Sequence, residues 1–127
     1  MPQIRENMTS EVVTIEPRAS IVEAAQRMIE EEKGPLPVVE GTRVVGMVTD
    51  RDIIARVVAA GRDPSSTRVE DIDTHDLVTV GPDADVDEAR RLMAEHHLDR
   101  ILVVEEDQHL VGIISEADLR SDEGPLA

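Results

Sequence analysis

The chain has 127 residues, enough for one compact domain or for two small units that share a core. Thirteen basic residues against 28 acidic ones give a formal net charge of −15, and the chain contains no Phe, Trp or Tyr. A negative charge of this size repels nucleic-acid phosphates and anionic lipids, and the bases of a single strand would find no aromatic ring to stack on. We therefore expect neither nucleic acid nor a membrane as a partner.

Lys33 is the only lysine among the 13 basic residues. This acidic, arginine-rich composition resembles that of proteins from high-salt cytoplasms, although a GC-rich genome would also replace lysine by arginine, and both explanations stay open. The chain has no cysteine, which excludes disulfides and thiolate metal sites. No apolar run approaches the roughly 20 residues of a membrane span, and the first residues lack an apolar leader, so we expect a cytoplasmic protein.

The first predicted strand is Glu11–Ile15, which is short and rich in β-branched residues, and a turn at Pro17 follows it. A helix is predicted next, because Ser20 and Glu23 have the spacing of a capping box. The apolar residues behind this cap recur at the helical period and are predicted to face the core. They are Ile21, Ala24, Ala25, Met28 and Ile29.

The segments Leu36–Val39 and Val44–Val48 are predicted to form a β-hairpin of two buried strands around the turn Glu40–Thr42. A second helix follows the hairpin. Its inward-facing residues are predicted to be Ile53, Ile54, Val57 and Val58. The predicted order of elements in this unit is β-α-β-β-α.

The whole unit occurs twice. An offset of 65 residues places Val13–Pro17 over Val78–Pro82, and one additional residue near Gln108 changes the offset to 66 for the last part. In the copy Asp85 is the predicted helix cap, the helix stripe is Val86, Ala89, Leu92 and Met93, the hairpin strands are Ile101–Val104 and Leu110–Ile114, and Leu119 faces inward from the last helix.

These repeats give the predicted domain organisation. The first unit covers residues 4–60, a turn-rich linker covers 61–68, and the second unit covers 69–121. Residues 122–127 are predicted to be a disordered tail. Because the linker is short, the sheets of the two units are expected to pack together, and the fold class is α/β (α+β).

Each unit contains the pattern G-h-h-S/T-x-x-D, at Gly46–Asp52 and again at Gly112–Asp118. One interpretation is structural: the hydroxyl caps the following helix and the acid lies in its first turn. The other is functional: the short carboxylate accepts hydrogen bonds from the two hydroxyls of a ribose, while the helix N-terminus favours a nearby phosphate. The spacing alone leaves both open.

The two units and the repeated pattern resemble a tandem pair of CBS (cystathionine β-synthase) domains, a Bateman module, over roughly residues 4–121. The segments Pro35–Val39 and Val48–Ile53 are typical of this family, and the linker Gly61–Pro64 is typical of its small stand-alone members. The resemblance implies a pseudo-two-fold module. It also implies two clefts that commonly hold adenosine-containing ligands such as AMP, ADP, ATP, NAD or S-adenosylmethionine.

By this resemblance Thr49 and Ser115 contact ribose or phosphate, and Asp52 and Asp118 accept the ribose hydroxyls. The adenine is implied to lie against apolar strand residues and two proline turns. The candidates for these walls are Pro17, Pro82, Leu36, Pro37, Ile101 and Leu102.

Arg51 and Arg100 are the cations best placed to meet a phosphate, unless each is a surface arginine paired with a neighbouring acid. Asp99 would repel a phosphate, and Ala117 stands where the first copy has Arg51. We therefore expect the first motif to hold phosphate better, and the second cleft to stay empty or to take a less charged ligand.

No other cluster predicts chemistry. Adjacent histidines on a helix, such as His96 and His97, point about 100° apart and are expected to be solvated and not metal ligands. No hydroxyl or amine has an evident base partner, so we expect no enzyme and no required cofactor. The predicted function is a non-catalytic, homodimeric regulatory module that senses an adenine nucleotide and acts on an unknown regulated protein. The alternative is a ligand-free dimerisation or scaffold protein.

Overall fold

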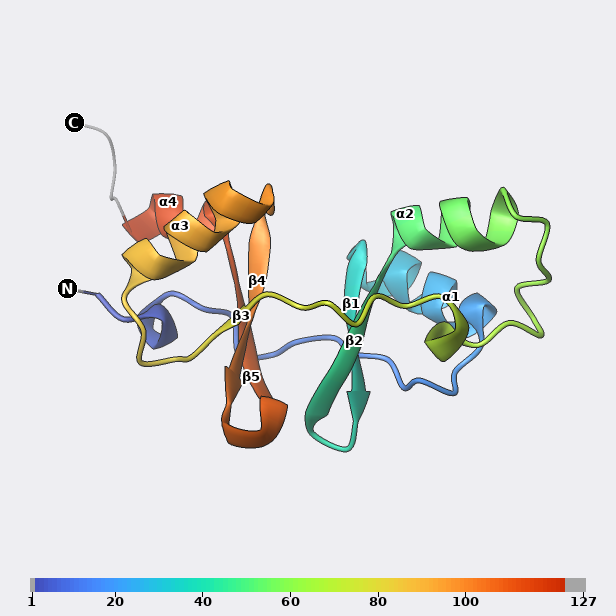
Figure 1. Ribbon diagram of the computed structural model, residues 1–127, viewed down its shortest axis with the longest axis horizontal. Helices are drawn as coiled ribbons and strands as arrows, with labels where there is room; N and C mark the ends of the chain where they lie inside the picture. The colour runs from blue at the N-terminus through green and yellow to red at the C-terminus, as the bar shows by residue number, and fades with distance from the viewer. Residues whose placement is uncertain (1, 123–127) are drawn as a thin grey trace. The chain divides into compact units, whose positions relative to one another are not determined.

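The computed structural model describes residues 2–122, which form two compact units (Figure 1). The contiguous unit contains residues 13–77, and the composite unit joins the N-terminal segment up to Val12 to the chain from Val78 onward. The sequence repeats were predicted to divide at 4–60 and 69–121, whereas each compact unit takes in the segment that precedes the other repeat. Each unit is described separately below.

The contiguous unit has one hairpin and a small set of helical segments. Its elements are α1 (Ile21–Glu31), β1 (Pro35–Glu40), β2 (Arg43–Thr49), α2 (Asp50–Ile53), the π-helical turn η2 (Ile54–Val58) and the 3₁₀ turn η3 (Val69–Asp71). Its core is aliphatic, and residues from α1, both strands, η2 and η3 meet in it. The fully buried members include Ile21, Leu36, Val48, Val57 and Val69.

The composite unit repeats this arrangement. Its elements are η1 (Ile4–Glu6), β3 (Thr79–Val80), α3 (Val86–His96), β4 (Arg100–Glu105), η4 (Glu106–Gln108), β5 (His109–Ser115) and α4 (Glu116–Asp122). Its core holds Ile4, Val86, Ile101, Val103 and Ile114, together with the predicted Leu119. Ile4 enters this core from the N-terminal segment, so the first residues of the chain complete the second repeat.

Both predicted hairpins are present. In β1–β2 the antiparallel register shifts between Val38 and Val39, and in β4–β5 it shifts between Val103 and Val104. These positions are 65 residues apart, so the repeat extends to a β-bulge at the same place in each hairpin.

The strand predicted at Glu11–Ile15 is wrong, because only Ile15 pairs with β1. Ile15 donates to the Pro37 carbonyl at 3.0 Å and accepts from the Val39 amide at 2.9 Å. The parallel ladder cannot extend toward Val13, since Pro37 has no N–H to donate. In the other repeat Leu102 stands at the place of Pro37, and β3 pairs with β4 over two residues.

The long helices begin where their caps predict. The Ser20 hydroxyl accepts from the Glu23 amide at 3.1 Å, and the Asp85 carboxylate accepts from the Asp87 amide at 2.9 Å. The Glu23 carboxylate pairs with Arg27 at 3.2 Å. The cap at Ser20 is therefore confirmed, while the carboxylate of its predicted capping box is engaged along the helix.

Three residues predicted to face the core are exposed instead. Ile29 of α1 is 79% exposed, and Ile54 and Val58 are 61% and 68% exposed, while Val57 between them is fully buried. After Ile53 the helix continues as a π-helical turn, in which the Ala59 amide donates to the Ile54 carbonyl at 2.8 Å. This wider turn departs from the 3.6-residue repeat on which the prediction rested.

The predicted linker docks on the start of α1. The Ile21 amide donates to the Thr67 carbonyl at 3.0 Å, and the buried Thr67 hydroxyl donates to the Asp63 carbonyl at 2.7 Å. At the other end Asp122 belongs to α4, and the rest of the predicted tail lies outside the described residues. Among residues 2–122, no helix is both long and apolar enough to cross a membrane.

Candidate functional site

The first copy of the repeated pattern ends β2 and begins α2. The Thr49 hydroxyl accepts from the Asp52 amide at 3.0 Å, and Asp52 Oδ2 accepts from the Thr49 amide at 2.9 Å. These two reciprocal bonds form a complete capping box. Both side chains are half-buried, and they fix the direction in which the chain leaves the strand.

The second copy makes the same pair of bonds. Asp118 donates its amide to the Ser115 hydroxyl at 3.2 Å, and its Oδ2 accepts from the Ser115 amide at 2.9 Å. The short aspartate side chain therefore reaches back to the cap in both repeats. The structural interpretation of the motif is thus satisfied in each unit.

The glycine of each motif is needed because another segment crosses over it. A Cβ on Gly46 would collide with the carboxylate of Asp73, and a Cβ on Gly112 would lie 2.7 Å from the Met8 sulfur and 2.8 Å from the Thr9 carbonyl oxygen. Met8 and Asp73 are equivalent positions, 65 residues apart. The segment before each repeat therefore packs directly against the motif strand of its compact unit.

Of the two predicted phosphate ligands, Arg51 alone has a side chain without a partner among the described residues. Arg51 is exposed, and its guanidinium makes no hydrogen bond or ion pair to any other residue between 2 and 122. Arg100 donates to both oxygens of Asp99, at 3.2 and 3.4 Å. This hydrogen bonding lowers the pKa of Asp99. Arg100 is thus paired with a neighbouring acid, whereas Arg51, two residues after Thr49, has no such partner among the described residues.

The predicted apolar walls divide between two faces of the strands. Leu36 and Ile101 are fully buried in the aliphatic cores of their units and cannot line a cleft there. Pro37 and Leu102 follow them directly and point to the opposite face, because successive side chains of a strand alternate. Both are buried as well, but their side chains face away from the aliphatic core of their unit. Of the four strand residues, these two therefore remain candidates for the apolar walls.

The proline turns lie away from the motifs of their own units. Thr49 pairs with Pro35 at one end of β1, whereas Ile15 pairs with Val38, which places Pro17 beside the other end at Glu40. At about 3.3 Å per residue, the two ends of β1 are roughly 16 Å apart.

The composite unit has the same layout. Ser115 pairs with Arg100, while Val80 pairs with Val103 and directs Pro82 toward Glu105. Neither unit therefore brings its own proline turn to its own hydroxyl and aspartate.

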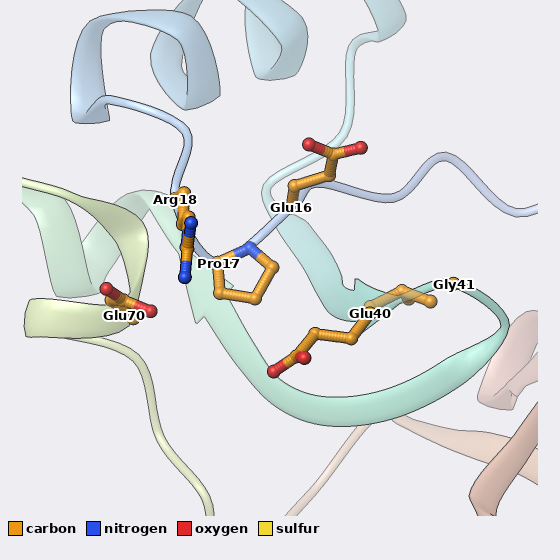
Figure 2. A pocket seen from close by; sticks show the side chains of 7 residues that line it. Glu16, Pro17, Arg18, Glu40, Gly41 and Glu70 are labelled. Atoms are coloured by element: carbon orange, nitrogen blue, oxygen red, sulfur yellow. The ribbon is translucent and has the colours of Figure 1, made fainter.

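A pocket of about 340 Å³ opens at the Glu40 end of the contiguous unit (Figure 2). It is lined by Glu16, Pro17, Arg18, Val39, Glu40, Gly41 and Glu70. Sequence reasoning identified only Pro17 among these residues, since the others share no spacing pattern. No group of three or more His, Cys, Asp or Glu side chains in the described part of the chain could hold a metal ion.

Comparison with known proteins identifies the fold. The family model described as "CBS domain" matches this chain twice, over residues 3–59 and 69–122. The chain belongs to the CBS domain family. It is 39% identical over 119 residues to the CBS domain-containing protein YhcV of Bacillus subtilis, an alignment that covers 94% of this chain and 84% of that protein.

Two solved CBS structures have the same fold. The structure of Hypoxic Response Protein I with two coordinated zinc ions has a TM-score of 0.87 and 33% identity, covering 96% of this chain and 99% of that one. The CBS domain pair of protein MJ0100, in complex with 5′-methylthioadenosine and S-adenosyl-L-methionine, has a TM-score of 0.83 and 26% identity, covering 98% and 97%. The predicted CBS pair and its mixed α/β fold are confirmed.

Proposed function

We propose that this CBS pair is a non-catalytic regulatory module that binds an adenosine-containing ligand, with Thr49 and Asp52 at the ribose and Arg51 at a phosphate. The observation that carries the proposal is that the two oxygens of the Asp52 carboxylate differ in their hydrogen bonding. Oδ2 is occupied by the Thr49 amide, whereas Oδ1 accepts no hydrogen bond from any described residue. One oxygen can therefore hold the helix cap while the other accepts a ribose hydroxyl, so the two interpretations of the motif are compatible.

The chemistry around the motif supports the same ligand class. A carboxylate oxygen accepts strongly from vicinal hydroxyls, and the free Arg51 guanidinium supplies a charge that phosphate requires in so acidic a chain. Pro37 and Leu102 are the proposed apolar contacts of the base. The MJ0100 complex gives independent support, because it shows adenosine compounds bound to a CBS pair of the same fold.

The second motif is proposed as the weaker site. Asp118 Oδ1 likewise accepts no hydrogen bond from any described residue, so a ribose contact is available there too. The predicted cation of the second motif is not available, because Arg100 is hydrogen-bonded to Asp99 and Ala117 replaces Arg51. We therefore propose a charged nucleotide at the first motif, and at the second motif either no ligand or a ligand that carries less negative charge. The proposed assembly is a homodimer that reports ligand occupancy to a regulated protein.

Calorimetric titration with AMP, ADP, ATP, NAD and S-adenosylmethionine tests the proposal. Wild type should bind at least one of them, and should bind the 2′-deoxy analogue of that ligand about 10- to 150-fold more weakly, since a hydrogen bond to a charged group is worth about 1.5–3 kcal/mol. Asp52→Ala should lose most of this preference for ribose. Asp118→Ala is the matched control and should keep it. If none of the five compounds binds to wild type, the proposal is overturned.

The complete capping boxes favour one other function, a ligand-free dimerisation or scaffold protein. In that case Asp52→Ala changes the free energy of unfolding and leaves no binding to lose. Arg51→Ala separates the two functions further, because this exposed side chain has no described structural partner and should affect only phosphate binding.

A further inference from the structure

One backbone hydrogen bond joins each proline turn to the segment that leads into the other repeat. In the contiguous unit the Glu70 amide donates to the Pro17 carbonyl at 2.9 Å, and in the composite unit the Arg5 amide donates to the Pro82 carbonyl at 3.0 Å. Arg5 and Glu70 are 65 residues apart, as are the two prolines. The backbone is therefore alike at both turns, and the turns differ through their side chains.

In the composite unit an ion pair joins the two charged residues at the proline turn. Asp83 directly follows Pro82, and its Oδ1 accepts from Nη2 of Arg5. Pro82 itself is buried. The opposite charges beside this turn therefore neutralise each other without any further group.

In the contiguous unit the two equivalent side chains, Arg18 and Glu70, have the opposite charges and stay apart. The Arg18 guanidinium makes no hydrogen bond or ion pair with any residue between 2 and 122, and the Glu70 carboxylate reaches only Arg68, at 3.9 Å. Pro17 remains partly exposed between them. The pocket of about 340 Å³ opens at this turn.

Three charged side chains lie around the ring of Pro17 in this pocket (Figure 2). They are Arg18, Glu40 and Glu70, while the Glu16 carboxylate points away from them. Glu40 is exposed, and its side chain pairs with no described residue. One guanidinium and two carboxylates complement a ligand that has one carboxylate and two cationic groups. The volume lies near the lower end of the range of about 300–1,000 Å³ for small-molecule pockets, which suits a single amino acid.

We propose that this pocket binds a free amino acid with a cationic side chain, of the lysine and arginine class. The Arg18 guanidinium donates to the α-carboxylate, the Glu70 carboxylate accepts from the α-ammonium group, and the Glu40 carboxylate accepts from the cation of the ligand side chain. The ligand thus bridges two side chains whose counterparts in the second repeat bond directly. This site is separate from the proposed adenosine site, because Pro17 and Thr49 lie at opposite ends of β1.

Calorimetric titration of the full chain with L-lysine and L-arginine, in low salt and without nucleotide, tests the proposal. At least one of the two should bind. Cadaverine lacks the carboxylate of lysine, and norleucine lacks its side-chain ammonium group. Each should bind at least about 10-fold more weakly than L-lysine, because it loses a charge-assisted hydrogen bond. If neither L-lysine nor L-arginine binds to wild type, or if cadaverine or norleucine binds as tightly as L-lysine, the proposal is overturned.

Matched variants of the two turns test the assigned residues. Arg18→Gln and Glu70→Gln should each weaken binding of L-lysine or L-arginine at least about 10-fold. Asp83→Asn removes the same charge as Glu70→Gln from the second turn and should leave binding unchanged. Arg18→Asp combined with Glu70→Arg gives the first turn the charges of the second and should abolish binding. Equal weakening by Glu70→Gln and Asp83→Asn would overturn the site, since it would reflect net charge alone. Because all three residues are exposed, thermal unfolding should show that the variants still fold.

Discussion

The carboxylate of Asp73 lies over Gly46 and occupies the space that a side chain at this position would need. On the neighbouring residues, Met47 and Thr74 exchange two backbone hydrogen bonds of 2.9 Å. The motif strand β2 is therefore paired through its backbone with the segment after η3. Only glycine at position 46 permits this segment to come so close to the strand.

Replacing Gly46 by alanine should destabilise the fold by about 1–3 kcal/mol, because Asp73 and the Thr74 backbone must move to admit a methyl group. Gly112→Ala should cost a similar amount against Met8 and Thr9. Urea denaturation measures both. Gly81→Ala is the control, since the nearest atom to its Cβ would be the Val104 carbonyl oxygen at 3.9 Å. Equal stability of all three variants would contradict the close approach.

Asp73 should make the stability of the protein depend on pH. The Asp73 side chain is 1% exposed, and this burial raises its pKa. His75 partly offsets the rise, because its Nε2 lies 2.8 Å from Asp73 Oδ1. Because the folded pKa is the higher one, the native state favours the protonated carboxyl. Its contribution to stability is complete below the ordinary value of 3.8 and is lost as the pH rises through the folded pKa.

Asp73→Asn should therefore gain stability relative to wild type as the pH is raised through the acid range, when urea denaturation curves of the two proteins are compared. A difference that shrank with rising pH would contradict this assignment. His75→Gln should raise the pKa of Asp73 further, since it removes the group that lowers it. The carboxyl resonance of Asp73 in an NMR titration reports this shift directly.

Ile4→Ala should destabilise the second repeat and not the first. Ile4 is fully buried in the composite unit beside Val86 and Ile114, and its amide donates to the Ala84 carbonyl at 2.9 Å. The expected cost is about 2–5 kcal/mol. Native-state hydrogen exchange should show faster opening of β4 and β5 with β1 and β2 little changed.

A variant of Val69 tests the same exchange of segments, in which the segment before each repeat packs into the unit of the other repeat. Val69 occupies the equivalent position and is fully buried in the contiguous unit. Val69→Ala should speed opening of β1 and β2. If each variant loosened the hairpin that follows it in sequence, the exchange of segments would be refuted.

Asp52→Ala and Asp118→Ala should each cost about 1 kcal/mol of stability without any ligand, because each removes an acceptor for the amide of its helix cap. Asparagine at either position keeps a side-chain oxygen and should cost less. Thermal unfolding of the four variants in ligand-free buffer checks this. A ligand-free Asp52→Ala that is as stable as wild type would show that the capping box contributes nothing.

Local signals predicted the regular elements well. Ser20 and Asp85 marked the starts of the two long helices, and alternating apolar strands around polar turns marked both hairpins. The prediction failed for Ile29, Ile54 and Val58, since periodicity identifies an apolar face without identifying what covers it. It also failed at Glu11–Ile15, where Pro37 on the neighbouring strand removes a donor that the strand's own sequence does not reveal.

The exchange of leading segments could not be read from the sequence either. Ile4 and Val69 are equivalent apolar residues in the two repeats, so each would satisfy either core, and only the folded structure shows which core each one enters. For the site, the repeated motif located Thr49, Asp52, Ser115 and Asp118. The sequence could not show that each aspartate divides its two oxygens, or that Arg100 is paired while Arg51 is free, because both depend on side-chain directions.

The joining of the N-terminal segment to the second repeat sets an order for folding during synthesis. Residues 13–77 hold every segment of their own unit, so this unit can close as soon as that stretch has left the ribosome. The segment that carries Ile4 emerges earlier and has no core to enter until α3 and β4 are made. The segment that carries Ile4 is therefore synthesised before the contiguous unit but buried after it, and a bulky domain fused ahead of this segment should delay the second repeat while the first folds at its normal rate.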